Sequence, residues 1–501
     1  MTQQLVVETR AGTVRGEQRP GAAPGLPAVS IWKGIPYAAP PIGELRFRPP
    51  QPAAPWTGER DATKFGMVAA QSRDPAIAMM SGVGDKILSG EDCLTLNVFS
   101  PGADGAKRPV VVWIHGGAFI MGSGSTPLYH GVSFASHHDL VVVTINYRLG
   151  LFGLLYLGDL APGRDEGNQA LLDQIAALRW VKDNIAAFGG DPERVTVMGE
   201  SAGAISIGSL LAMPAARGLF HRAILQSGAA VLSPPTREDM TAVARTVLGD
   251  LGVTVDELPG VPEARLLAVQ EKLSREKGLG AFAPFIDGVT VPEPPIVAVR
   301  AGAASNIPLL VGSNRDEWTL FEVFLGDRTI KPFEVPLRER LGATLDELLA
   351  IYQRDRPGRT VQQAWVELIG EIAFRIPAIR LAEAQSDHQR AVYMYRFDWS
   401  SPALGGRLGA AHGLDLPFVW NRIDLPASKV LLGEAVETAQ PLATQLHATW
   451  AAFIRSGDPN GGGLPPWPTY GRARRQTMLI DRTSTVVDDP AGVARALYPE
   501  F

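Results

Sequence analysis

Apolar runs and amphipathic segments alternate along the chain. The runs at residues 109–114, 140–147 and 195–198 are mostly apolar, which is typical of strands buried on both faces of a parallel sheet. Between the last two, residues 169–188 carry apolar side chains at helical spacing, and the glycines at 189 and 190 follow as stop signals. Strands that alternate with helices predict a parallel sheet with right-handed crossovers.

Strand patterns also occur outside this region. Residues 94–99 alternate as in a half-exposed strand, whereas residues 32–47 are so rich in proline and glycine that we expect a long ordered loop. The other strand patterns lie at residues 5–15, which we interpret as an edge hairpin, and at 220–228, 307–312 and 391–397. Together they predict the α/β class, with a central, mostly parallel sheet and helices on both faces.

Two long segments carry helical patterns beyond the sheet. Residues 235–280 and 320–390, approximately, are expected to form helical insertions over the active site that shape a pocket. Residues 74–90 are the least patterned part of the N-terminal half, and we expect them to border the entrance to a site. The chain has no internal repeat or low-complexity linker, so we expect one domain over residues 1–501.

Composition narrows the classes of function. The chain is 46% hydrophobic and 20% charged, and its net charge of −5 shows no basic footprint, which argues against nucleic acid or an anionic membrane as partner. No apolar stretch approaches the ~20 residues of a membrane span, and no signal peptide is visible at the N-terminus. The single cysteine, Cys93, cannot form an intramolecular disulfide and has no basic neighbour, so we expect a buried, inert thiol and a cytoplasmic location.

The first chemical motif follows the strand pattern at 195–198. Residues 199–203 read GESAG, and a small-residue run that predicts a helix comes next. A strand, G-x-S-x-G and a helix form a nucleophile elbow, a sharp turn that projects a serine above the sheet. Gly199 and Gly203 avoid a Cβ where strand and helix crowd together. The motif alone also fits a structural turn, but the context on both sides favours Ser201 as a nucleophile.

A serine nucleophile needs a histidine base, which in this arrangement follows it in the sequence. His221 lies at the start of a strand, His388 at a polar helix end and His447 in an amphipathic helix, so we interpret all three as structural or surface residues. His412 lies in a glycine-flanked loop after the strand pattern at 391–397. We therefore expect His412 to be the base.

The base needs an acid that orients it. Asp316 and Glu317 both follow the strand pattern at 307–312, and Glu322 lies slightly beyond them. Position selects this loop but does not distinguish the two adjacent carboxylates. From the residues alone, Asp316 and Glu317 are equal candidates.

The tetrahedral intermediate of acyl transfer needs backbone N–H donors around its oxyanion. His115, Gly116, Gly117 and Ala118 follow the strand pattern at 109–114 and match an HGG-type oxyanion loop. The N–H of Ala202, the residue after the nucleophile, would join them. An ordinary glycine turn is the alternative, but it leaves the coincidence with the elbow unexplained.

At this point the motifs resemble the type-B carboxylesterases, the family of bacterial p-nitrobenzyl esterases, animal carboxylesterases and cholinesterases. The resemblance covers almost the whole chain, because its motifs occur in order from the N-terminal quarter to the histidine loop. They are GIPYA at 34–38, EDCLTLNV at 91–98, HGGAF at 115–119, NYR at 146–148, GESAG at 199–203, QSG at 226–228, RDE at 315–317 and HGLDLP at 412–417.

The resemblance implies roles that the residues alone leave open. It implies the α/β-hydrolase fold, Glu317 as the acid, and an oxyanion hole made by the N–H groups of Gly117, Ala118 and Ala202. Ser227 matches a buried serine that supports the acid in relatives. The loop from His115 to Ala118 is similar to oxyanion loops of the GGG(A)X type.

Three positions depart from the family pattern. Ala69 stands where relatives have the partner of the half-cystine that Cys93 matches. Trp318 replaces the glycine after the acid, and Asp415 replaces the usual glutamate of the histidine loop. The first departure fits a bacterial cytoplasmic member.

These observations predict a serine carboxylic-ester hydrolase that acts through an acyl-enzyme on small to medium esters, without cofactor or metal. Ser201, His412 and Glu317 would form its triad. One alternative is the same machinery acting on carbamates or aryl amides, and another is a non-catalytic cholinesterase-like binding module. The expected partner is a small-molecule ester. The sequence sets no oligomeric state, and a monomer is compatible with it.

Overall fold

A computed structural model describes residues 5–72, 88–161, 163–164 and 167–499. Most of segment 74–90, expected to border an entrance, lies outside these residues. The chain forms two compact units, so the expectation of one domain over 1–501 stays a prediction. The first unit comprises Met1–Ile224, Pro234–Ile307 and Ile454–Ser456, and the second Leu225–Ser233, Pro308–Phe453 and Gly457–Phe501.

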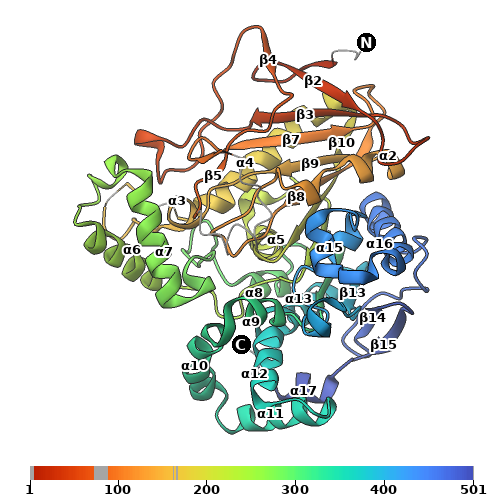
Figure 1. Cartoon of the computed structure of the whole chain (residues 1–501). Coiled ribbons are helices and arrows are strands. Elements are labelled where there is room, and N and C mark those ends of the chain that lie inside the picture. The colour runs from red at the N-terminus through yellow and green to blue at the C-terminus, as the bar shows by residue number, and fades with distance from the viewer. Residues whose placement is uncertain (1–4, 73–87, 162, 165–166, 500–501) are drawn as a thin grey trace. The chain divides into compact units, whose positions relative to one another are not determined.

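The first unit contains a sheet with the strand order β1-β2-β3-β7-β9-β8-β10 (Figure 1). Its outer strands pair antiparallel, whereas β8 pairs parallel with both β9 and β10. These central strands are the apolar runs of the sequence. The strands of this unit are β1 (Leu5–Glu8), β2 (Thr13–Arg19), β3 (Val29–Pro36), β4 (Glu59–Asp61), β5 (Val68–Ala69), β6 (Ser89–Gly90), β7 (Thr95–Ser100), β8 (Arg108–Ile114), β9 (Val141–Ile145) and β10 (Gly190–Glu200).

Two expectations for this sheet were wrong. Residues 32–47 were expected to form a loop, but the first part of them belongs to β3, which pairs with β7. The pairing register shifts between Trp32 and Ile35, and Gly34 takes a φ of 63° there, so a bulge explains the irregular sequence. β7 is buried along its whole length rather than half-exposed, because helix α2 packs on it.

The helices of the first unit follow the predicted alternation. The long amphipathic segment forms α4 and continues as a 3₁₀ turn that ends at Gly189 in the left-handed region. The insertion at 235–280 forms α6 and α7, which lie side by side (Figure 1). The helices are α2 (Val132–His138), α3 (Gly150–Leu154), α4 (Gln169–Asn184), α5 (Ala202–Ala212), α6 (Arg237–Leu251), α7 (Glu263–Lys277) and α8 (Pro295–Arg300).

The chain passes from the first unit to the second within strand β11 (Arg222–Gln226). The second unit has the strand order β12-β13-β14-β15, with β12, β13 and β14 parallel. Its strands are β12 (Leu309–Asn314), β13 (Val392–Phe397), β14 (Gln476–Ile480) and β15 (Thr485–Asp488).

The insertion at 320–390 is helical, as expected, and belongs to the second unit. Helix α13 packs on β12 and β13, and a π-helical turn, Glu371–Arg375, joins α12 to α13 and packs on β12. The helices are α9 (Thr319–Leu325), α10 (Lys331–Leu341), α11 (Ala343–Asp355), α12 (Val361–Gly370), α13 (Ile376–Ser386), α14 (Leu416–Val419), α15 (Pro426–Leu432), α16 (Val436–Ser456) and α17 (Gly492–Leu497). Within the described ranges, no helix is both long and apolar enough to cross a membrane.

Candidate active site

The sharp turn predicted at Ser201 is present between β10 and α5. Ser201 has a φ of 56° and a ψ of −123°, a conformation that side chains other than glycine rarely adopt. A Cβ on Gly199 would lie 2.7 Å from the carbonyl carbon of Gly203, and a Cβ on Gly203 would strike the Ile114 oxygen. The glycines therefore permit the close strand–helix packing that strains Ser201. Strain of this kind typically costs about 1–3 kcal/mol and is common at active sites.

The expected oxyanion loop lies against this turn. Because Ile114 at the end of β8 pairs with Gly199 at the end of β10, the two following loops begin at the same sheet edge. A Cβ on Gly116 would lie 3.0 Å from the Cβ of Ser201, which shows how closely the loop approaches the serine. Gly117, Ala118 and Phe119 all have positive φ values, of 114°, 51° and 59°.

The turn leaves backbone donors available. Ile120 and Met121 donate to the Gly117 oxygen, but within the described part of the chain the N–H groups of Gly117 and Ala118 have no acceptor. The N–H of Ala202, at the first position of α5, has no partner inside its own helix. These are the three donors that the resemblance implies.

His115 fixes the start of this loop. Its ring stacks on Tyr147 with centroids 4.5 Å apart, and the Tyr147 hydroxyl donates to the His115 oxygen at 2.7 Å. Burial lowers the pKa of His115 to about 4, although a hydrogen bond to the Gly116 oxygen opposes this. His115 is therefore neutral, and Nδ1 must carry the proton because the carbonyl can only accept.

In the second unit, the loops after β12 and β13 bring an acid to a histidine. The Oε2 atom of Glu317 lies 2.6 Å from Nδ1 of His412, and the two side chains are 2% and 7% exposed. The other carboxylate oxygen, Oε1, accepts the backbone N–H of Asn314 at 2.7 Å. The backbone N–H of His412 also donates to the backbone carbonyl oxygen of Glu317 at 3.3 Å. The two loops are therefore joined by both backbone and side-chain hydrogen bonds.

The neighbouring carboxylate faces a different environment. Asp316 makes ion pairs with Arg315, Arg356 and Arg359, and it accepts the Ala410 N–H at 2.9 Å. Burial alone would raise the pKa of Asp316, but Arg315 and Arg356 outweigh burial and hold it far below its usual range. The structure thus distinguishes two carboxylates that the sequence left equal.

A buried polar cluster lies beneath the acid and the histidine. The side-chain N–H₂ of Asn314 donates to the Ala411 oxygen at 2.6 Å and to Asp415 at 3.3 Å, and Asp415 also accepts from Gln226 and Tyr395. Burial raises the pKa of the Asp415 carboxyl. The role of Asn314 was missed, because nothing in the motif RDE points to the residue before it.

Ser227, the residue expected to support the acid, is fully buried and donates its N–H to Gly312. No hydrogen bond of its hydroxyl is found within the described residues, so its supporting role stays a prediction. The other histidines make structural contacts. Val195 donates its N–H to His221, and Nδ1 of His447 lies 2.7 Å from the Val419 oxygen.

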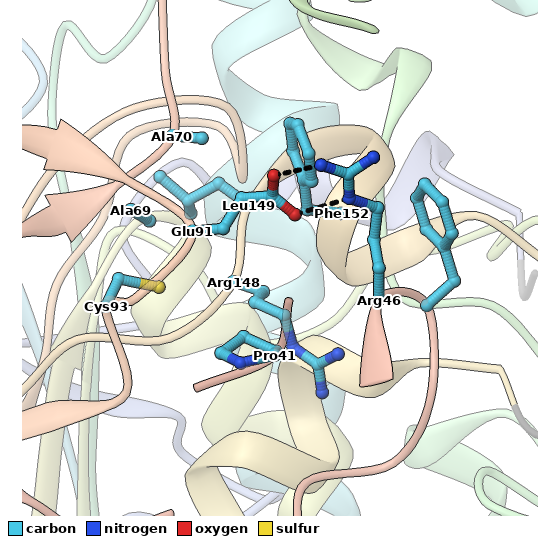
Figure 2. Close-up of a pocket in the computed structure, with 10 residues that line it drawn as sticks. Pro41, Arg46, Ala69, Ala70, Glu91, Cys93, Arg148, Leu149 and Phe152 are labelled. Carbon is cyan, nitrogen blue, oxygen red and sulfur yellow. Dashed lines mark hydrogen bonds and ion pairs between the residues drawn. The ribbon is translucent and has the colours of Figure 1, made fainter. Parts of the chain in front are cut away.

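A small cavity in the first unit contains none of these residues (Figure 2). Its volume of about 10 Å³ holds one water molecule at most, and no ester fits. Arg46 and Glu91 form an ion pair on its wall, with Nε 2.6 Å from Oε2. Cys93 and Ala69 both line the cavity, and burial raises the pKa of the Cys93 thiol, as expected for an inert residue.

The described residues include no group of three or more His, Cys, Asp or Glu side chains that could hold a metal ion. The structure does contain a serine on a strained turn, a buried acid–histidine pair and a loop with backbone donors. These are the parts of acyl-transfer chemistry.

Comparison with known proteins points the same way. Residues 3–494 match the model of the carboxylesterase family. The chain is 39% identical to the para-nitrobenzyl esterase of Bacillus subtilis (strain 168), over 100% of this chain and 99% of that protein. It is 37% identical to the phenmedipham hydrolase of Pseudarthrobacter oxydans, over 93% of each. The crystal structure of Geobacillus stearothermophilus carboxylesterase EST55 is 42% identical, covers 99% of this chain and 100% of its own, and gives a TM-score of 0.87.

Proposed function

Because the chain belongs to the carboxylesterase family, with the α/β-hydrolase fold of its solved relatives, we propose that Ser201, His412 and Glu317 form its catalytic triad. The protein is a serine hydrolase of carboxylic esters. In this proposal the N–H groups of Gly117, Ala118 and Ala202 form the oxyanion hole.

The proposed reaction proceeds in two halves. Ser201 Oγ attacks the ester carbonyl carbon while Nε2 of His412 takes the hydroxyl proton, and Glu317 stabilises the imidazolium through Nδ1. The carbonyl oxygen becomes an oxyanion held by the three backbone N–H groups. When the tetrahedral intermediate collapses, the carbon–oxygen bond to the alcohol breaks and His412 returns its proton to the leaving alkoxide. Water, deprotonated by His412, then hydrolyses the acyl-enzyme and releases the acid. Neither half needs a metal or cofactor.

The conformation of Ser201 carries this proposal. A strained residue at a strand–helix turn, against a loop with unused N–H donors, has no evident structural purpose. The acid–histidine pair supports the same reading, because a buried Glu317 at 2.6 Å from Nδ1 leaves Nε2 as the atom that can serve as base.

Neither alternative is favoured. The named relatives are esterases and hydrolases rather than binding proteins, and this chain keeps a serine, a histidine and an acid in the expected loops. Hydrolysis of carbamates or aryl amides would use the same residues and is a question of substrate range. We propose small to medium carboxylic esters as substrates, with p-nitrobenzyl esters the first to test because of the Bacillus subtilis relative.

We also propose a cytoplasmic location. The free and buried Cys93, with Ala69 in the place of a disulfide partner, fits a reducing compartment.

A panel of chromogenic esters with increasing acyl length tests the function. The full-length protein should hydrolyse short and medium esters, and Ser201→Ala should lose about 10⁶-fold in turnover. Ser206→Ala is the matched control, because Ser206 is buried in α5, the helix that follows Ser201, and accepts a hydrogen bond from Gln174. Equal losses in both variants would show that the serine acts on folding and not on chemistry.

A further inference from the structure

The residue that follows Glu317 is a buried tryptophan. Trp318 is 6% exposed and packs on Phe321, Phe333 and Phe374, with centroid distances of 4.7 Å, 5.3 Å and 6.3 Å.

Two of these phenylalanines also contact the histidine. The ring centroid of Phe374 lies 4.5 Å from that of His412, with 33° between the planes. The Phe321 centroid lies 5.2 Å from His412, at 40°. Phe333 contacts Trp318 but has no such contact with His412 among the ring pairs that the structure describes. Trp318 is therefore linked to the imidazole through Phe321 and Phe374.

The backbone explains how rings from distant segments meet. Phe321 lies on α9, one turn beyond Glu317, and Phe374 lies on the π-helical turn after α12. A Cβ on Gly370 would lie 3.3 Å from both Glu317 Cβ and Trp318 N, so the end of α12 packs directly on the acid loop. A buried ion pair between Arg375 and Glu371, with Nε 2.6 Å from Oε1, spans the π-helical turn. Turns of this kind are often found at functional sites.

The contribution of Trp318 comes through packing. Its indole N–H has no hydrogen-bond partner within the described residues, so no polar contact ties it to Glu317 or His412. Aromatic rings near a cation stabilise it, and His412 would become a cation in each half of the reaction. Rings held firmly against the imidazole would favour that cation and fix its orientation.

We propose that Trp318 is a positioning residue that holds Phe321 and Phe374 against His412 and so favours the imidazolium formed during ester hydrolysis. This inference rests on the function proposed above for His412. In this unit the carboxylates of Glu317 and Asp415 also act on His412, and the Trp318 and Phe374 variants leave both carboxylates in place.

The test compares Trp318→Gly and Trp318→Phe in the full-length protein, with active sites counted by titration with a phosphonate ester. Trp318→Gly should lower kcat by about three- to tenfold with little change in KM. The midpoint of the acid limb of kcat/KM should fall by about half a pH unit, because the imidazolium loses its aromatic contacts. Trp318→Phe should keep most of the activity. Trp318→Leu replaces the glycine variant if the latter does not fold, with the same expectation.

Two further measurements separate positioning from stability. Trp467→Gly removes a tryptophan that is 3% exposed and contacts Tyr393, so it should lower the melting temperature without moving the acid limb. Phe374→Leu removes a ring that contacts His412 directly, so it should also lower the midpoint of the acid limb of kcat/KM. If Trp318 acts through Phe374, the loss of log kcat in the double variant should be smaller than the sum of the losses in the two single variants.

Unchanged kcat per titrated site and an unchanged acid midpoint in Trp318→Gly or Trp318→Leu would overturn the inference. Strictly additive losses in the double variant would also contradict it. A different result, absence of phosphonate label on Ser201 in the unaltered protein, would reject the proposed triad itself rather than the role of Trp318.

Discussion

Glu317 Oε2 lies 2.6 Å from His412 Nδ1, whereas the carboxylate of Asp316, one residue earlier, is enclosed by arginines. Adjacent acids of the same loop thus have different surroundings. Glu317 is the carboxylate that contacts the imidazole. Asp316 holds the acid loop to the histidine loop, because it accepts the Ala410 N–H and donates its own N–H to the Ala410 oxygen.

The two isosteric amide substitutions should therefore differ. Glu317→Gln should lower kcat by about 10³–10⁴-fold with the fold intact, because the imidazolium loses its counter-charge and the tautomer is no longer held. Asp316→Asn removes the anion that the partly buried Arg315 and Arg356 pair with, so it should destabilise the protein by about 1–3 kcal/mol and reduce turnover per folded molecule far less. Urea unfolding and kcat per titrated site distinguish them. The reverse order of activities would show that Asp316 is the catalytic acid.

Ester hydrolysis should decline on the acid side as His412 takes a proton. The ordinary range of histidine places the midpoint of kcat/KM in the free enzyme at about pH 6–7. Initial rates, taken before any loss of folded protein, give this profile. A rate that stays flat down to about pH 4 would be incompatible with a histidine base.

Stability should also fall on the acid side, through His115. Its pKa of about 4 in the folded protein lies below the 6.5 of the unfolded chain, so between these values the unfolded chain binds more protons. This contribution to stability is complete above pH 6.5 and is lost as the pH falls towards 4. Between pH 7 and 4.5 it amounts to about 2–3 kcal/mol.

His115→Asn removes the titration while its amide can still donate to the Gly116 oxygen. The change in the free energy of unfolding between pH 7 and 4.5 should then be smaller by about 2–3 kcal/mol. His138, whose pKa burial also lowers to about 4, contributes in the same direction in both proteins and leaves a residual slope. Identical pH slopes for the unaltered protein and His115→Asn would show that His115 is not the group responsible.

The oxyanion loop should tolerate bulky alcohols. Ala118 has a φ of 51°, and the similarity of this loop to the GGG(A)X type implies space beside the scissile bond. We predict measurable hydrolysis of tert-butyl acetate, slower than that of primary acetates. Ala118→Gly removes one methyl group from a position that suits glycine, so the tertiary rate should rise, within about tenfold. No Ser201-dependent rate in either protein would show that other parts of the pocket set alcohol tolerance.

The sequence predicted those parts of the fold that depend on local pattern. Buried strands such as Arg108–Ile114 and the amphipathic helix Gln169–Asn184 follow from periodicity alone, and the turn at Ser201 follows from its glycines. Val29–Pro36 was missed because a bulge at Gly34 interrupts the strand pattern. Long-range pairing, which β7 supplies, overrides such local signals.

The site shows a similar division. The loops pointed to Ser201 and His412 as candidates, whereas the residues alone left Asp316 and Glu317 equal and only the family resemblance implied Glu317. Only the folded chain shows that the arginines surround Asp316 and leave Glu317 for the imidazole. Phe374 could not be anticipated either, because it lies on a π-helical turn that the helical pattern of the sequence does not reveal. Its contact with His412 joins segments that are far apart in the sequence.

Covalent labelling tests the central claim most directly. A fluorophosphonate ester should inactivate the full-length protein with one adduct per chain, and peptide mass spectrometry should place it on Ser201 alone. Ser206→Ala should be labelled like the unaltered protein, and Ser201→Ala should show neither label nor activity. A label on another residue, or a Ser201→Ala protein that keeps a tenth of the rate, would contradict the assignment of Ser201 as the nucleophile.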